Sequence, residues 1–136
     1  MTVPICKTER TPVNILLVDD DAIQASTRQA ILERAGLSVD VATNGRDALS
    51  FVQSPDGYSV SLVITDHLMP VMNGPEFVRS LRESGYKFPV VVLSGYADAE
   101  ESYDSLEVVF RVKPFPPDQL IALAQYLVGN SERRTA

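Results

Sequence analysis

The chain has little of several residue types that would point to a particular chemistry. Its 136 residues include one cysteine, one histidine and no tryptophan, which excludes an internal disulfide and a multi-cysteine metal site. No segment approaches the roughly 18 apolar residues that a transmembrane helix needs. Residues 1–12 contain three charged side chains and lack the apolar stretch of a signal peptide. These absences predict a cytoplasmic protein without a membrane partner.

Positive charge is scarce as well. Eighteen Asp and Glu residues outnumber twelve Lys and Arg residues, which gives a net charge of -6. Binding to DNA or to an anionic membrane without sequence specificity needs a positive field, so direct DNA binding is not expected. The length suits a single domain, predicted at 13–129 between an N-terminal tail (1–12) and a C-terminal tail (130–136).

The sequence does contain a regular alternation of strand-like and helix-like segments. Apolar runs rich in Val, Ile and Leu occur near 13–18, 38–42, 60–65, 89–93 and 108–112. Nearly continuous apolar runs are typical of strands that are covered on both faces, and helical spacing of apolar residues lies between them. The pattern predicts an α/β fold: a three-layer, doubly wound (βα)5 protein with a five-stranded parallel sheet of order 2-1-3-4-5, which is flavodoxin-like.

Residues typical of helix ends divide the chain at the same places. Asp21 and Asn44 can cap the N-termini of the first two helices through their side-chain oxygens. Gly36 is a candidate for the end of the first helix, and Pro75 suits the first turn of the third.

Four of the strand-like runs end in side chains that can carry chemistry. Asp19 and Asp20 follow the first run, and Asp66, Ser94 and Lys113 follow the third, fourth and fifth. Because the C-terminal ends of parallel strands lie along one edge of a sheet, these side chains are expected to meet in one crevice.

The three carboxylates of this crevice would repel one another. Two unit charges about 4 Å apart interact by about 4 kcal/mol at an effective dielectric constant near 20, and Lys113 neutralises only one carboxylate. Oxygen ligands without histidine or cysteine favour Mg²⁺, or Mn²⁺, over zinc. Since Mg²⁺ in proteins commonly binds a phosphate as well, a phosphoryl group accepted by Asp66 is the natural further ligand.

Four short strings carry a resemblance to a known family. They are LLVDDD at 16–21, DHLMP at 66–70, LSGYA at 93–97 and VKPF at 112–115. In this order, each closing a strand, they resemble the signature segments of response-regulator receiver domains of two-component signalling. The similarity covers about 13–129 and is to a CheY-like receiver. Because 130–136 is too short for an output domain, the chain is expected to be a receiver that stands alone or one that has been excised from a longer protein.

The resemblance implies a role for each residue of the crevice. Asp66 would take a phosphoryl group from a phosphohistidine of a sensor histidine kinase or histidine phosphotransfer protein. Ser94 and Lys113 would then bind its oxygens. Mg²⁺ would be bound directly by Asp20, mainly through water by Asp19, and by Asp66 and the backbone carbonyl of Leu68.

The resemblance also implies a switch and a docking surface. Phosphorylation would draw the Ser94 loop inward, and Phe110, three residues before Lys113, would turn into the vacated space and change the surface for an unknown output partner. The first helix and the 114–117 loop would receive the phosphodonor. Pro114 is expected to be cis. No enzymatic activity is expected beyond the phosphorylation and dephosphorylation of the protein's own aspartate.

One departure from the family limits the resemblance. Only eighteen residues separate Ser94 from Lys113, and the usual glycine-containing turn is missing from 102–110. The fourth helix is therefore expected to be short or irregular.

Two alternatives remain open. A haloacid-dehalogenase-like phosphatase begins with an Asp-x-Asp pair, which residues 19–21 can imitate. That class needs Thr or Val where this chain has Ile23, and it needs an acidic pair after the lysine, where this chain has only Asp118. It would also give Asp66 no role. The second alternative is a degenerate receiver that works as a constitutive interaction module, although all five expected chemical side chains are present.

Overall fold

The computed structural model describes residues 15–135, with side chains for 15–129. The five strands are β1 (Ile15–Val18), β2 (Val39–Ala42), β3 (Leu62–Asp66), β4 (Val90–Ser94) and β5 (Val109–Val112). The helices are α2 (Ala22–Arg34), α3 (Gly45–Gln53), η1 (Pro55–Ser59), α4 (Gly74–Glu83), η2 (Ala97–Tyr103) and α5 (Pro117–Thr135), with η marking a 3₁₀ helix. The predicted N-terminal tail and the first two residues of the first predicted strand lie outside the described residues.

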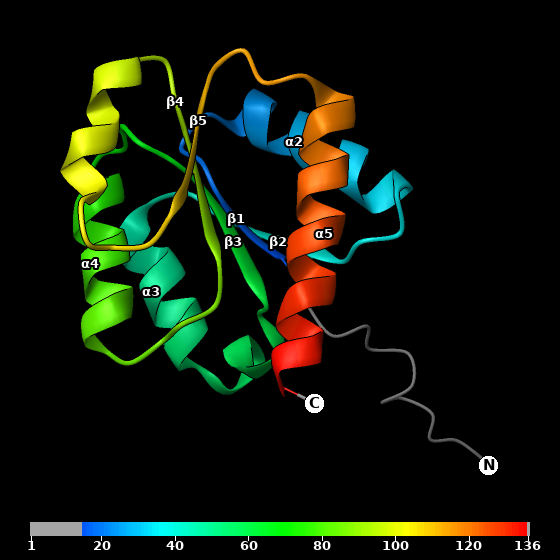
Figure 1. Cartoon of the computed structure of the whole chain (residues 1–136), viewed down its shortest axis with the longest axis horizontal. Coiled ribbons are helices and arrows are strands. Elements are labelled where there is room, and N and C mark those ends of the chain that lie inside the picture. Colours follow the sequence, from blue (N-terminus) through cyan, green and yellow to red (C-terminus); the bar gives the residue numbers. More distant parts are fainter. Residues whose placement is uncertain (1–14, 136) are drawn as a thin grey trace.

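The strands form one parallel sheet in the order β2-β1-β3-β4-β5, which confirms the predicted topology (Figure 1). The order reverses beside β1, since β1 pairs with β2 on one side and with β3 on the other. Ligands of open α/β sheets bind outside the carboxyl ends of the strands at such a reversal. The topology therefore predicts a ligand site at the carboxyl ends of β1 and β3.

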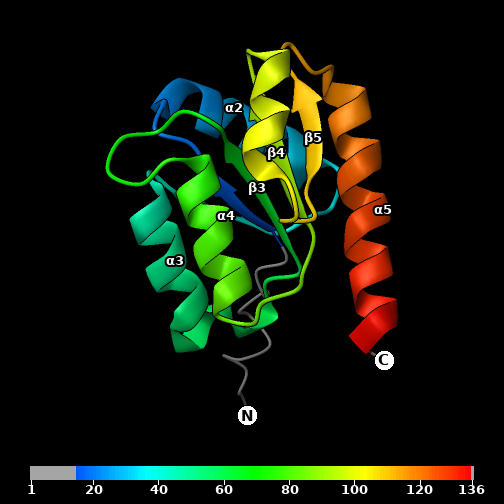
Figure 2. The same cartoon turned by 60° about the vertical axis from the view of Figure 1, so that its left-hand side comes forward.

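Alternate side chains of each strand enter two separate cores. Leu16, Val18 and Val63 pack with α3 and α4, while Ile15, Leu17 and Leu62 pack with α2 and α5. The two views show the corresponding layers, with α3, α4 and η2 on one face of the sheet and α2 and α5 on the other (Figures 1 and 2). Burial on both faces explains why these strands read as continuous apolar runs.

The predicted helix ends are confirmed. Asp21 accepts hydrogen bonds from the backbone N–H groups of Ile23 and Gln24, and Asn44 accepts one from Asp47. Gly36 follows α2 with a φ of 91°, a conformation that glycine adopts at little cost. Pro75 lies in the first turn of α4.

The prediction of a short or irregular helix between the fourth and fifth strands is also confirmed. The segment between β4 and β5 forms only the 3₁₀ helix η2. The turn that follows uses Ser105 and Glu107 at φ values of 71° and 59° in place of glycine. Arg82 of α4 stabilises this turn, because its guanidinium donates hydrogen bonds to the carbonyls of Leu106 and Glu107 at 2.9 Å each.

The last helix, α5, continues past residue 129 to Thr135, so it runs through most of the segment predicted as a tail. The domain bounds of 13–129 stay a prediction. Within residues 15–135, no helix has both the length and the apolar character needed to cross a membrane.

Candidate functional site: an acidic crevice at the ends of β1 and β3

Asp19 and Asp66 lie next to each other at the carboxyl ends of β1 and β3. The backbone N–H of Asp19 donates to the carbonyl of Ala42 at 3.0 Å, which extends the sheet beyond β1. The Asp19 carboxylate accepts the N–H of Asp21 at 2.9 Å, so the start of α2 fixes its orientation. Both acidic residues are almost fully buried, with 1% and 5% of their surface exposed.

Asp20 completes a cluster of three carboxylates. One oxygen from each of Asp19, Asp20 and Asp66 lies within 4.8 Å of the others, and Asp20 alone of the three is exposed. Hard oxygen ligands at this spacing fit Mg²⁺ or Mn²⁺, which prefer carboxylates and water to nitrogen or sulfur. The three acidic residues predicted from the sequence are thus brought together in a group that can hold a divalent cation.

Lys113 reaches the same group from the end of β5. Its ammonium lies 3.0 Å from Oδ1 of Asp66, and 28% of its side chain is exposed. Its backbone N–H donates to the carbonyl of Ser94 at 2.7 Å, which ties the ends of β4 and β5 together. The following peptide bond, Lys113-Pro114, is cis as expected.

Arg28 also belongs to the site, although the sequence did not predict it. Its Nη1 donates to Oδ2 of Asp19 at 2.8 Å and to Oδ1 of Asp66 at 3.4 Å. Arg28 lies seven residues after the cap Asp21, two helical turns or about 10 Å along α2, on the same face of the helix. Side chains on a helix tilt toward its N-terminus, so a long arginine at this position can reach back to the crevice, and that spacing was the available signal.

The buried carboxyl of Asp19 has a pKa raised to about 7. Burial is the main cause, because it removes water from the charged form, and a hydrogen bond to the Asp66 carboxyl acts in the same direction. The N–H of Asp21 and the guanidinium of Arg28 oppose the shift. Without a metal, the crevice therefore binds a proton near neutral pH.

Ser94 is buried at the end of β4 and lines a cavity beside the acidic cluster. Its hydroxyl accepts the N–H of Tyr96 at 2.9 Å and donates to the carbonyl of the same residue at 3.2 Å. The cavity, of about 330 Å³, is also lined by Lys113, His67 and Leu68. Leu68 is 61% exposed. The cavity contains the hydroxyl of Ser94 and the ammonium of Lys113, which is ion-paired with Asp66, and an added phosphoryl group would need such partners.

Phe110, the predicted switch residue, is buried between the sheet and η2. It pairs with Val92 across β4 and β5, and its ring centroid lies 6.0 Å from that of Tyr103. Tyr103 in turn contacts the residue after Asp66, since its hydroxyl lies 2.8 Å from Nδ1 of His67. This contact between the crevice and η2 was not predicted from the sequence.

Comparison with known proteins identifies the family. Residues 15–125 match the family described as the response regulator receiver domain. The chain belongs to that family. It is 33% identical over 131 residues to the alkaline phosphatase synthesis transcriptional regulatory protein SphR of Synechococcus elongatus, covering 90% of this chain and 51% of that protein. It is also 30% identical to the two-component response regulator 24 of Arabidopsis thaliana, over 82% of this chain and 81% of that protein.

Solved receiver structures are similar in fold. The chemotaxis response regulator CheY4 of Vibrio cholerae is 33% identical and superposes with a TM-score of 0.74, over 86% of this chain and 99% of that chain. The chain spans about half the length of most of the curated relatives it matches. A receiver domain is a signalling phosphoacceptor module rather than a true enzyme.

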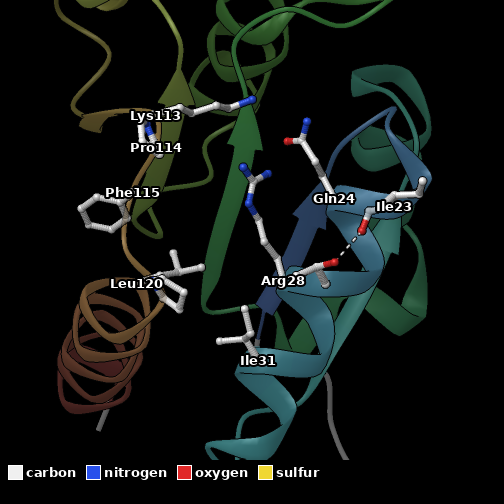
Figure 3. A pocket seen from close by; sticks show the side chains of 10 residues that line it. Ile23, Gln24, Arg28, Ile31, Lys113, Pro114, Phe115 and Leu120 are labelled. Atoms are coloured by element: carbon white, nitrogen blue, oxygen red, sulfur yellow. Dashed lines mark hydrogen bonds between the residues drawn. The ribbon is translucent and has the colours of Figure 1, made fainter.

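A groove of about 530 Å³ opens between α2 and the loop that connects β5 to α5 of the receiver (Figure 3). Apolar side chains from both elements line it, among them Ile23, Ile31 and Phe115. Arg28 and Lys113 line it too, and both also form ion pairs with Asp66. The groove and the acidic crevice are therefore neighbours with two residues in common.

Proposed function

We propose that this receiver accepts a phosphoryl group on Asp66 from a phosphohistidine, with Mg²⁺ bound beside it. One observation carries the proposal: the Asp66 carboxylate lies within an acidic cluster and 3.0 Å from the Lys113 ammonium. A carboxylate in this position is both a nucleophile and a metal ligand. A purely structural acid would need only one counter-charge, whereas this cluster holds three carboxylates at the edge where ligands bind.

The reaction requires little covalent chemistry from the protein. An oxygen of Asp66 attacks the phosphorus in line, an acyl phosphate bond forms, the phosphorus–nitrogen bond breaks, and the imidazole leaves with the bonding electrons and takes up a proton. Lys113 pairs with one phosphoryl oxygen, and Ser94 reorients its hydroxyl from the Tyr96 carbonyl toward another. A bound divalent cation would supply positive charge to the phosphoryl oxygens.

The metal would be held by carboxylates of Asp19, Asp20 and Asp66 and by the backbone carbonyl of Leu68. Asp20 is the exposed member of the cluster and so has room for the waters that Mg²⁺ commonly retains. Asp19 is held by the backbone N–H of Asp21, which suits contact with the ion through water.

The output step would use Ser94 and Phe110. Movement of the Ser94 hydroxyl toward the phosphoryl group breaks its bonds to Tyr96 and changes the packing at the end of β4. Phe110 lies on the neighbouring strand and contacts Tyr103 of η2, so a change there alters the surface that η2 presents.

The phosphodonor would dock over the groove between α2 and the β5–α5 loop. A donor histidine must come within bonding distance of Asp66, and this groove is an apolar surface that shares Arg28 and Lys113 with the crevice. Ile23 is 79% exposed at its rim, which makes it a suitable contact for an apolar helix of a histidine kinase or histidine phosphotransfer protein.

Labelling with a small acyl phosphate tests the proposal. The wild-type chain should gain one phosphoryl group only when Mg²⁺ is present, Asp66→Asn should gain none, and the control Asp98→Asn, a change at an exposed aspartate of η2, should label normally. Labelling that persists in folded Asp66→Asn would contradict the proposal and favour the phosphatase alternative with Asp19 as nucleophile.

A further inference from the structure

Arg28 bridges two of the carboxylates that would hold a divalent cation. A single nitrogen, Nη1, donates to Asp19 at 2.8 Å and to Asp66 at 3.4 Å. These are two of the three residues whose oxygens lie within 4.8 Å of one another. The guanidinium therefore connects two carboxylates of the acidic cluster, rather than pairing with one carboxylate at the edge of the cluster.

The surroundings of Arg28 make this contact stronger than an ordinary surface ion pair. Only 17% of the Arg28 side chain is exposed, and the side chains of Asp19 and Asp66 are 0% and 6% exposed. Charge-assisted hydrogen bonds between such groups are shorter and stronger than neutral ones, and water screens them less than it screens exposed pairs.

Arg28 and a metal ion cannot both keep their best positions. A magnesium ion binds carboxylate oxygens at about 2.0–2.1 Å and carries two positive charges. If a guanidinium stayed on the same oxygens, the ion would repel it with twice the energy of two unit charges at the same distance. The Arg28 side chain has space to withdraw, because it lines the groove between α2 and the β5–α5 loop (Figure 3).

We propose that Arg28 is a built-in counter-cation that competes with Mg²⁺ for Asp19 and Asp66. It stabilises the metal-free crevice, weakens the affinity for Mg²⁺, and moves into the groove when the ion binds. Arg28 is therefore a positioning residue that sets the Mg²⁺ concentration at which the receiver becomes competent. This inference rests on the proposed function, because it requires the acidic cluster to be a metal site.

Mg²⁺ titration of Arg28→Gln tests the competition, with Arg34→Gln as a control that removes the same charge from an exposed position of the same helix. Calorimetry should give a dissociation constant that is about tenfold lower in Arg28→Gln, the change that a lost competing pair of about 1.4 kcal/mol produces. Arg34→Gln should match the wild type. Mg²⁺ should also raise the melting temperature of Arg28→Gln more than that of the wild type, a difference that a merely structural role would not produce.

An unchanged or weaker Mg²⁺ affinity in folded Arg28→Gln would overturn the inference while leaving the proposed function intact, provided that the wild type binds Mg²⁺. Failure of the wild type to bind Mg²⁺ would overturn both. If Arg28→Gln does not fold, the guanidinium NMR signals of Arg28 in the wild type decide the question. They should shift as Mg²⁺ is added, and signals that stay constant through saturation would contradict the competition.

Discussion

The Nδ1 atom of His67 lies 2.8 Å from the hydroxyl of Tyr103, which joins the residue after the proposed phosphoacceptor to the helix that replaces the usual fourth helix. Gly74 makes the contact possible, because a Cβ atom there would lie only 2.1 Å from the Tyr103 oxygen. Burial lowers the pKa of His67 and raises that of Tyr103, so both side chains stay neutral and share a hydrogen bond at neutral pH.

Tyr103→Phe should destabilise the fold by about 1 kcal/mol, because it removes the hydroxyl and leaves the ring in place. Chemical denaturation measures the change. Tyr126→Phe is the matched control, since Tyr126 is 61% exposed on α5, and it should have little effect. Equal free energies of unfolding in the two variants would show that the His67 contact contributes nothing to stability.

Lys113→Ala should separate metal binding from the switch. The variant keeps all three carboxylates of the cluster and should still bind Mg²⁺, but it lacks the ammonium that lies 3.0 Å from Asp66. After phosphorylation, NMR chemical-shift changes near Ser94 and Phe110 should be smaller than in the wild type. Lys87→Ala, at an exposed position before β4, serves as control. Shift changes as large as those of the wild type would count against a role of Lys113 in the switch.

Arg82→Met should destabilise the fold by about 1–3 kcal/mol, because it removes the charged donor from four backbone carbonyls, three of which make partly buried hydrogen bonds. The guanidinium donates to Leu106 and Glu107 before β5 and to Tyr86 and Phe88 before β4, at distances from 2.9 to 3.1 Å.

The control for Arg82→Met is Arg79→Met, at an exposed position of the same helix, which should change the free energy of unfolding by less than about 0.5 kcal/mol. A loss in Arg82→Met no larger than that of Arg79→Met would mean that the turn before β5 holds its shape without the guanidinium.

The sheet, its order and the position of the crevice could be predicted because each depends on local patterns. Continuous apolar runs mark strands that are buried on both faces, and parallel topology then places Asp19, Asp66 and Lys113 at one edge. The irregular helix η2 was predicted because only eighteen residues separate Ser94 from Lys113 in the sequence. The sheet and the crevice needed only residue order and periodicity, whereas the irregular helix was predicted by comparison with the receiver family.

Arg28 and Tyr103 were not predicted, because their contacts depend on side-chain length and on packing between segments far apart in the sequence. For Arg28, the seven-residue spacing from the cap Asp21 was the one available signal. Arg28 lies in the middle of a helix, with no motif around it, and reaches the crevice only through its long side chain. The contact of Tyr103 with His67 depends on the space that Gly74 leaves.

The raised pKa of Asp19, about 7 in the folded chain against 3.8 for an ordinary aspartate, predicts how stability depends on pH. Between these values the folded state holds a proton that the unfolded state has lost, so the free energy of unfolding of the metal-free protein should fall as pH rises from about 4 to about 7. Denaturation at several pH values in the presence of a chelator measures this slope.

Two controls isolate the contribution of Asp19 to that slope. Asp19→Asn cannot titrate and should flatten it, and saturating Mg²⁺ should reduce it because the ion favours the charged carboxylate. A slope that is the same in Asp19→Asn and in the wild type would assign the titration to another group.

Chemical mapping of the phosphorylated residue tests the central claim most directly. The wild-type chain is treated with a small acyl phosphate and Mg²⁺, the product is reduced with borohydride, which converts an aspartyl phosphate to homoserine, and the peptides are sequenced by mass spectrometry. Homoserine is expected at position 66, and none is expected when Mg²⁺ is chelated. Homoserine at position 19 or 20, or labelling at 66 that is independent of the metal, would contradict the claim.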